Sequence, residues 1–173
     1  MAIYGTIGTV TGQLSTTNIP SGGILQVVTA TYSGGYISST NGANPPTSTS
    51  GASLFSQSFT PLSASSTIWI RTSSTNIHEE SNVSDMCWIA CFRNTTLISC
   101  SGGTVNYTSW EGNLNAASTA LNCSVASWGT SAQTINVRVG MVSPGQSFYA
   151  NGNTYSNFAS NNATIGLTIM EVK

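Results

Sequence analysis

Charge is scarce in this sequence. Only 5% of its 173 residues are Asp, Glu, Lys or Arg, and the formal net charge is −1, whereas soluble domains carry about 25% charged residues. Nucleic-acid binding depends on Lys and Arg side chains that neutralise phosphates, and basic helices at membrane surfaces need the same residues. Because the four basic residues form no cluster, we expect neither nucleic acid nor a membrane as a partner.

Long apolar runs are also missing, and no stretch approaches the roughly 18 apolar residues of a membrane-spanning helix. The amino terminus, MAIYGTIGTVTGQ, lacks both the basic region and the continuous apolar region of a signal peptide. We therefore expect the protein to be made in a cytoplasm without export.

Histidine occurs once, as His78, directly before Glu79 and Glu80. No H-E-x-x-H motif is present, and adjacent carboxylates point to opposite sides of an extended chain. No G-x-S-x-G motif singles out one of the many serines as a nucleophile. We therefore expect no enzymatic activity, no metal and no cofactor. A calcium or protomer-contact role for Glu79, Glu80 and Asp85 stays open as the alternative to a solvated connection.

The four cysteines are Cys87, Cys91, Cys100 and Cys123. Their spacing lacks the two matched short Cys pairs of a structural zinc site. Disulfides are rare in proteins that stay in the cytoplasm, so free thiols are expected.

Small neutral polar residues take the place of charge. The chain has 28 Ser, 24 Thr and 16 Asn, together 68 of 173 residues. Apolar residues recur with a period of two and not with a helical period, which predicts an all-β fold. Loops are expected at 33–52, 101–115 and 143–162. The predicted strands are Gly23–Tyr32, Leu54–Thr60, Thr67–Thr72, Asp85–Arg93, Leu97–Cys100, Leu121–Trp128, Thr134–Val142 and Thr164–Val172.

This many short strands predict one antiparallel β-sandwich of the jelly-roll kind over residues 23–173. Residues 1–22 are expected to form an extended arm, whose apolar Ile3, Tyr4 and Ile7 cannot bury themselves. They would be ordered by contact with another molecule or a neighbouring copy, with a loose terminus as the alternative.

Five segments of the chain resemble a module of tailed-phage virion proteins, particularly of phages that infect cyanobacteria. They are GGILQVV, SFTPLSASSTIWI, CFRNTTLI, QTINVRVGM and TIGLTIMEVK. Members of that group are tail fibres or capsid decoration (cement) proteins, and the resemblance implies a jelly roll like those of the tumour necrosis factor trimers. It therefore implies a homotrimer on the virion surface, with the major capsid protein as partner. Only a short arm precedes the module here, which favours decoration over the alternative, a receptor-binding fibre tip.

The last predicted strand is apolar on both faces, which suits a strand that also contacts other copies. The residues predicted for a trimer interface are Leu167, Ile169, Met170 and Val172. A central strand beneath a loop is the alternative explanation.

Aromatic residues among Asn and Gly in two predicted loops could stack on sugars or anchor a partner. The candidate ligand-facing residues are Tyr107, Trp110, Tyr149 and Tyr155. The other explanation is that they close the ends of the sandwich or line the trimer seam.

Overall fold

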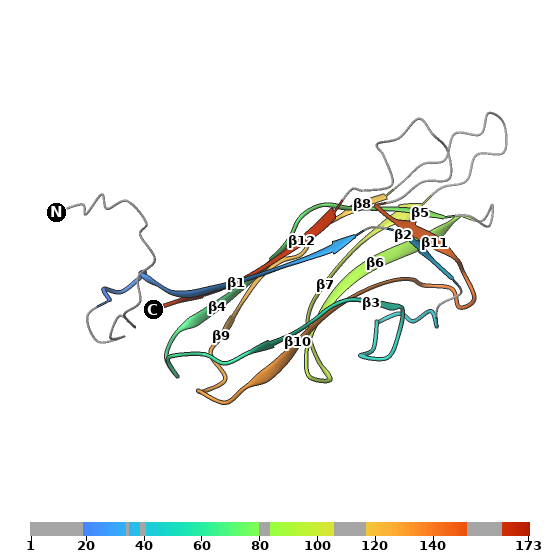
Figure 1. The fold of residues 1–173 in the computed structure, drawn as a ribbon. Helices are drawn as coiled ribbons and strands as arrows, with labels where there is room; N and C mark the ends of the chain where they lie inside the picture. The colour runs from blue at the N-terminus through green and yellow to red at the C-terminus, as the bar shows by residue number, and fades with distance from the viewer. Residues whose placement is uncertain (1–18, 34, 39–40, 80–83, 106–116, 152–163) are drawn as a thin grey trace.

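The computed structural model describes residues 19–33, 35–38, 41–79, 84–105, 117–151 and 164–173. All twelve secondary-structure elements in these ranges are β-strands (Figure 1). No helix there is long and apolar enough to cross a membrane. The prediction of an all-β antiparallel sandwich is confirmed.

Two four-stranded sheets form the two layers. The first consists, in spatial order, of β1 (Ile24–Ser33), β12 (Thr164–Val172), β4 (Thr67–Thr72) and β9 (Asn122–Ala126). The second consists of β3 (Ala52–Phe59), β10 (Gln133–Met141), β6 (Asp85–Arg93) and β7 (Thr96–Val105).

A third, smaller sheet lies at one end of the sandwich (Figure 1). It is formed by β2 (Gly35–Ile37), β11 (Phe148–Ala150), β5 (Thr75–Glu79) and β8 (Ala117–Thr119). Each of these short strands is the chain neighbour of a strand in the first sheet and keeps the same spatial order. The small sheet thus continues the first sheet toward that end.

The pairing of the strands follows one rule. Each strand in the first half of the chain pairs antiparallel with the strand at the mirrored position in the second half: β1 with β12, β2 with β11, β3 with β10, β4 with β9, β5 with β8, and β6 with β7. This is a single long hairpin, rolled up so that β12 also pairs with β4 and β10 with β6. A rolled antiparallel ribbon of this kind is a jelly roll.

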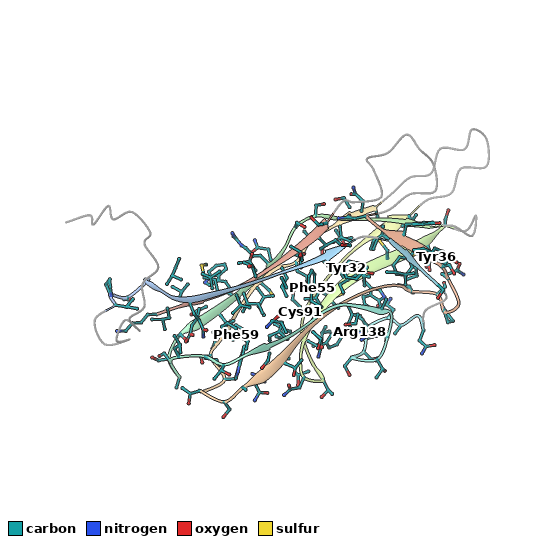
Figure 2. The ribbon with its side chains drawn as sticks, in the orientation of Figure 1. Tyr32, Tyr36, Phe55, Phe59, Cys91 and Arg138 are labelled. Atoms are coloured by element: carbon teal, nitrogen blue, oxygen red, sulfur yellow. The ribbon has the colours of Figure 1, made fainter. Side chains whose placement is uncertain are left out.

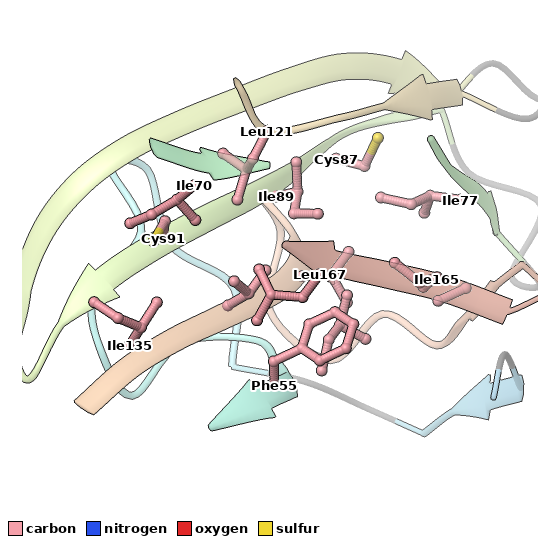
Figure 3. Packing of buried hydrophobic residues seen from close by; sticks show 14 of the residues in the cluster. Phe55, Ile70, Ile77, Cys87, Ile89, Cys91, Leu121, Ile135, Ile165 and Leu167 are labelled. Carbon is pink, nitrogen blue, oxygen red and sulfur yellow. The ribbon is translucent and has the colours of Figure 1, made fainter. Parts of the chain in front are cut away.

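The core lies between the two large sheets and is built by alternating residues (Figure 3). In β10, Ile135, Val137 and Val139 are completely buried, as their period of two predicts. Where β1 and β3 face each other, the rings of Tyr32 and Phe55 meet edge to face, 6.3 Å apart.

Strand β6 is apolar on both faces, as predicted for a central strand. Cys91 faces the main core, whereas Trp88 and Phe92 form a second small cluster on the outer face of their sheet. Part of the connection between β2 and β3 packs over this cluster. Arg138, labelled in Figure 2, holds that connection in place through its Nε and Nη2 atoms, which donate to the backbone oxygens of Ser50 (2.6 Å) and Gly51 (2.7 Å).

Four expectations about loops need correction. Strand β7 runs on to Val105, and β2 and β11 lie within stretches predicted as loops. His78 and Glu79, expected in a solvated connection, belong to β5. Three-residue strands are too short to show a period of two. In β7 the two glycines favoured a loop in the prediction, but the close approach of β7 to β6 requires glycine. A Cβ on Gly102 would lie 2.7 Å from the Cys87 oxygen.

Candidate interaction surface

The outer face of the β1-β12-β4-β9 sheet carries an apolar row. Strand register places Val27 beside Met170 and Met170 beside Trp69, and Ile24 beside Val172 in the next row. Ile24 and Val27 are 55% and 51% exposed, and the other three side chains are half-buried. We call these five residues the open face.

The open face is bordered by neutral polar groups and one cation. The next row across the sheet contains Thr29, Thr168, Arg71 and Asn122. The Arg71 guanidinium lies 5.9 Å from the centre of the Trp69 ring, and its Nε donates to Asn122 Oδ1 at 2.9 Å. The cation is therefore held at the rim by the ring and the amide, and the apolar row itself carries no charge.

The predicted trimer-interface residues divide between the two faces of β12. Leu167 and Ile169 are 1% and 0% exposed and pack inside the sandwich, so in one copy they are not accessible to another. Met170 and Val172 lie on the open face. β12 is a central strand between β1 and β4, as the alternative explanation required. Of the four predicted interface residues, Met170 and Val172 are the two that a second copy could contact.

Three members of the open face were not assigned a role from the sequence: Ile24, Val27 and Trp69. The alternation of Thr67–Thr72 already places Trp69 opposite the buried Ile68 and Ile70. A large aromatic residue on the polar side of a strand was the available signal.

The chain enters the domain beside the open face. The Gly22 N–H donates to the Lys173 carbonyl O at 2.6 Å, and the Lys173 N–H donates to Gly23 O at 2.9 Å. Lys173 Nζ donates to Ile19 O at 2.8 Å. Residues 19–23 are thus tied to the end of β12, next to Ile24, near the C-terminus in Figure 1.

The predicted docking residues Ile3, Tyr4 and Ile7 lie outside the described residues. Residues 19–22 of the predicted arm are described, and their attachment to β12 places the point from which the arm starts. The division at residues 22 and 23 remains a prediction.

A buried carboxylate fixes the end of β12 beneath the open face. Glu171 is 0% exposed. Its oxygens accept hydrogen bonds from the backbone N–H groups of Leu62 and Ser63, from Ser66 Oγ at 2.6 Å and from Gln26 Nε2 at 2.7 Å. Burial opposes ionisation, but these donors outweigh it and hold the pKa of Glu171 below its ordinary value. The carboxylate thereby joins the connection between β3 and β4 to the first sheet.

Glu171 was not assigned a role from the sequence. Its signal was its position, because it falls on the same face as Ile165, Leu167 and Ile169 in a strand with a period of two.

The ligand-facing prediction rests, within the described residues, on Tyr149 alone, because Tyr107, Trp110 and Tyr155 lie outside them. Tyr149 in β11 contacts Tyr36 in β2, with ring centres 5.2 Å apart and planes inclined by 50°. Tyr36 is 51% exposed. Figures 1 and 2 place this pair at the end of the sandwich away from the C-terminus. Tyr36 was not assigned a role from the sequence, although it too lies in a stretch predicted as a loop; its pairing with Tyr149 across β2 and β11 is what marks it.

Asp85 has backbone partners. Its Oδ2 accepts from the Ser143 N–H at 2.9 Å and its Oδ1 from the Met86 N–H at 2.7 Å. Within the ranges given above, no group of three or more His, Cys, Asp and Glu residues is placed to hold a metal ion.

The chain was compared with known proteins. No family model matches the sequence, and no curated protein matches it. Two similar solved structures are titled "Structure of infectious bursal disease virus Gx strain" and "Crystal structure of infectious bursal disease virus VP2 subviral particle". They are 11% and 13% identical to this chain, with TM-scores of 0.41 and 0.39.

The matches cover 84% and 85% of this chain but only 37% of each of those viral chains. Likeness at this level does not indicate a function.

Proposed function

We propose that the chain is a structural protein of a virus particle, a capsid decoration protein that associates as a homotrimer through the open face. The observation that carries the proposal is the partly exposed, uncharged apolar row of Val27, Met170 and Trp69 on the outer face of the first sheet. Patches of this kind mark interaction sites, because burying them removes apolar surface from water.

The composition of the rim fits association between like copies. A stable interface buries about 800 Å² on each partner, so the row of Thr29 and Thr168 beside the apolar row would be buried too. These hydroxyl groups carry no charge and can hydrogen-bond to the same groups of another copy, which lowers the cost of their burial. Contacts of this kind depend little on salt.

The arm supplies the second part of the proposal. Residues 1–18 contain no Asp, Glu, Lys, Arg or His, and the chain leaves the domain next to the open face. In a trimer three arms start near the associated faces, so three weak contacts with the major capsid protein add up. Ile3, Tyr4 and Ile7 are the proposed docking residues.

The test is binding to purified capsids that lack this protein. We expect the full chain to bind saturably with three copies per site, and deletion of residues 1–18 to abolish binding while the oligomer persists. Equal binding of the deletion variant would refute the docking role of the arm. Failure of the full chain to bind any capsid preparation would refute the decoration role.

A receptor-binding tip of a tail fibre is the second candidate, and the exposed Tyr36–Tyr149 pair supports it. Paired aromatic rings at one end of a domain offer a surface for the apolar faces of sugars. Adsorption of the isolated protein to host cells, lost in Tyr36→Ala and kept in Tyr36→Phe, would favour this function. Capsid binding without adsorption would favour decoration.

A further inference from the structure

Two of the four thiols meet across the core. Cys91 lies on β6 in the second sheet, is 0% exposed and faces inward. Cys123 lies on β9 in the first sheet, pairs in register with Ile70 and packs against the same core. Figure 3 shows the Cys91 sulfur beside Ile70. The facing layers thus bring together two cysteines that are 32 positions apart in the chain.

The contacts of Cys123 fix its position against the second sheet. Its thiol donates to the Ile70 carbonyl O at 3.8 Å within its own sheet. Its sulfur is also hydrogen-bonded by the side chains of Cys91 and Ser99, which are partners in the β6–β7 pairing. The two sulfur atoms are therefore neighbours in the folded single copy.

The two thiols differ in reactivity. The hydrogen bond from Cys91, opposed by burial and aided by Ser99, lowers the pKa of Cys123. The same hydrogen bond, together with burial, raises the pKa of Cys91. Burial raises the pKa of Cys87 to about 11 and also raises that of Cys100. Cys123 is partly exposed, so it combines access with thiolate character, which determines the reactivity of cysteine.

We propose that Cys91 and Cys123 form a disulfide that joins the two sheets when the folded protein meets a peroxide. The Cys123 thiolate attacks one peroxide oxygen, the O–O bond breaks and hydroxide leaves, giving a sulfenic acid. The Cys91 sulfur then attacks the Cys123 sulfur, and its proton leaves with the departing hydroxyl group as water. Two thiols are oxidised by two electrons, and one peroxide is reduced to two water molecules.

The cross-link would act as a covalent staple between layers that otherwise pack through side chains. Closing the loop from 91 to 123 restricts the unfolded chain and so stabilises the folded one. A protein made in a reducing cytoplasm and released outside the cell would gain this staple only after release. That timing depends on the proposed function, but the pairing of the two thiols does not.

The test uses the full chain, fully reduced and treated with hydrogen peroxide at pH 8. We expect the intact mass to fall by two hydrogen atoms and peptide mapping to find a Cys91–Cys123 cross-link. The thermal midpoint should rise by roughly 5–10 °C. Addition of dithiothreitol should reverse both changes.

Cys123→Ser is the informative variant and Cys100→Ser its matched control, because Cys100 is exposed and lies on β7. The first should lose the cross-link and the gain in midpoint, and the second should keep both. A wild-type chain that retains both thiols, or that is oxidised only at Cys100 to a linked dimer, would overturn the proposal. Because the mapping uses the wild-type chain, the outcome does not depend on how well the variants fold.

Discussion

The two outer faces of the sandwich both carry apolar side chains, but they differ in how far the chain itself covers them. On the β3-β10-β6-β7 sheet, Trp88 and Phe92 are 3% and 1% exposed, and the chain's own connection near Ser50 and Gly51 packs over part of this face. On the β1-β12-β4-β9 sheet, Ile24 and Val27 remain more than half exposed. The first face is covered in part within one copy, although Met86 and Leu97 on it remain 51% and 39% exposed, whereas no described segment packs over the second.

The Trp88 side chain packs closely on the outer face of the second sheet, which we call the covered face. A Cβ on Gly140 would lie 2.5 Å from the Trp88 ring, and one on Gly51 would lie 2.6 Å from it. Two glycines therefore leave room for the indole between β10 and the overlying connection. No described segment packs over the open face in this way.

The largest expected effect comes from removing the centre of the covered face. Trp88→Ala deletes a buried indole and the hydrogen bond from its Nε1 to Met141 O. It should lower the free energy of unfolding by about 3–5 kcal/mol. Trp69→Ala on the open face, measured in dilute protein, should cost about 1 kcal/mol because that side chain is half-buried. If urea denaturation showed equal losses of unfolding free energy for Trp88→Ala and Trp69→Ala, the proposed difference between the two faces would be wrong.

Glu171 tests whether hydrogen bonds within a single copy stabilise the end of β12 beneath the open face. Replacing it by Gln puts an amide among four donors, and we expect a loss of about 2–3 kcal/mol. Since its folded-state pKa is below the ordinary value of 4.5, its stabilisation is complete above pH 4.5. It is lost as the pH falls through the folded value.

Urea midpoints measured between pH 7 and pH 3 should therefore fall less for Glu171→Gln than for the wild type. Parallel pH profiles of the two proteins would show that the carboxylate does not carry this dependence.

Arg138 tests how the connection between β2 and β3 is held over the outer face of the second sheet. Arg138→Ala removes two charge-assisted hydrogen bonds to the overlying connection and should cost about 1.5–2 kcal/mol. Hydrogen exchange should increase around residues 47–51. Arg71→Ala, the matched change at the rim of the open face, removes a cation–π contact and should cost about 0.5–1 kcal/mol. Unchanged exchange around residues 47–51 would mean that Arg138 does not hold the cover in place.

The fold could be predicted where one face of a strand is apolar and the other is not. Ile135, Val137 and Val139 alternate with polar neighbours, so both the strand and its inward face followed from the sequence. In β12 both faces are apolar, and the pattern alone could not say which one is inward. That is why Leu167 and Ile169, now in the core, were grouped with Met170 and Val172.

Contacts between distant segments could not be predicted from the sequence. The pairing of Tyr36 with Tyr149 and the approach of Cys91 to Cys123 depend on how the hairpin rolls up, and no local pattern encodes it. The same holds for Glu171, whose donors lie more than 100 positions away.

The most direct test of the account is sedimentation equilibrium of the wild type beside Val27→Lys. The lysine places a charge in the apolar row of the open face, on the edge strand β1, at a position that is half exposed, so the single copy should still fold. Ser56→Lys, on the exposed outer side of β3, is the matched control. We predict three times 17.9 kDa for the wild type and the control, and a single copy for Val27→Lys. A wild type that sediments as one copy, or a Val27→Lys variant that keeps the trimer mass, would contradict the account.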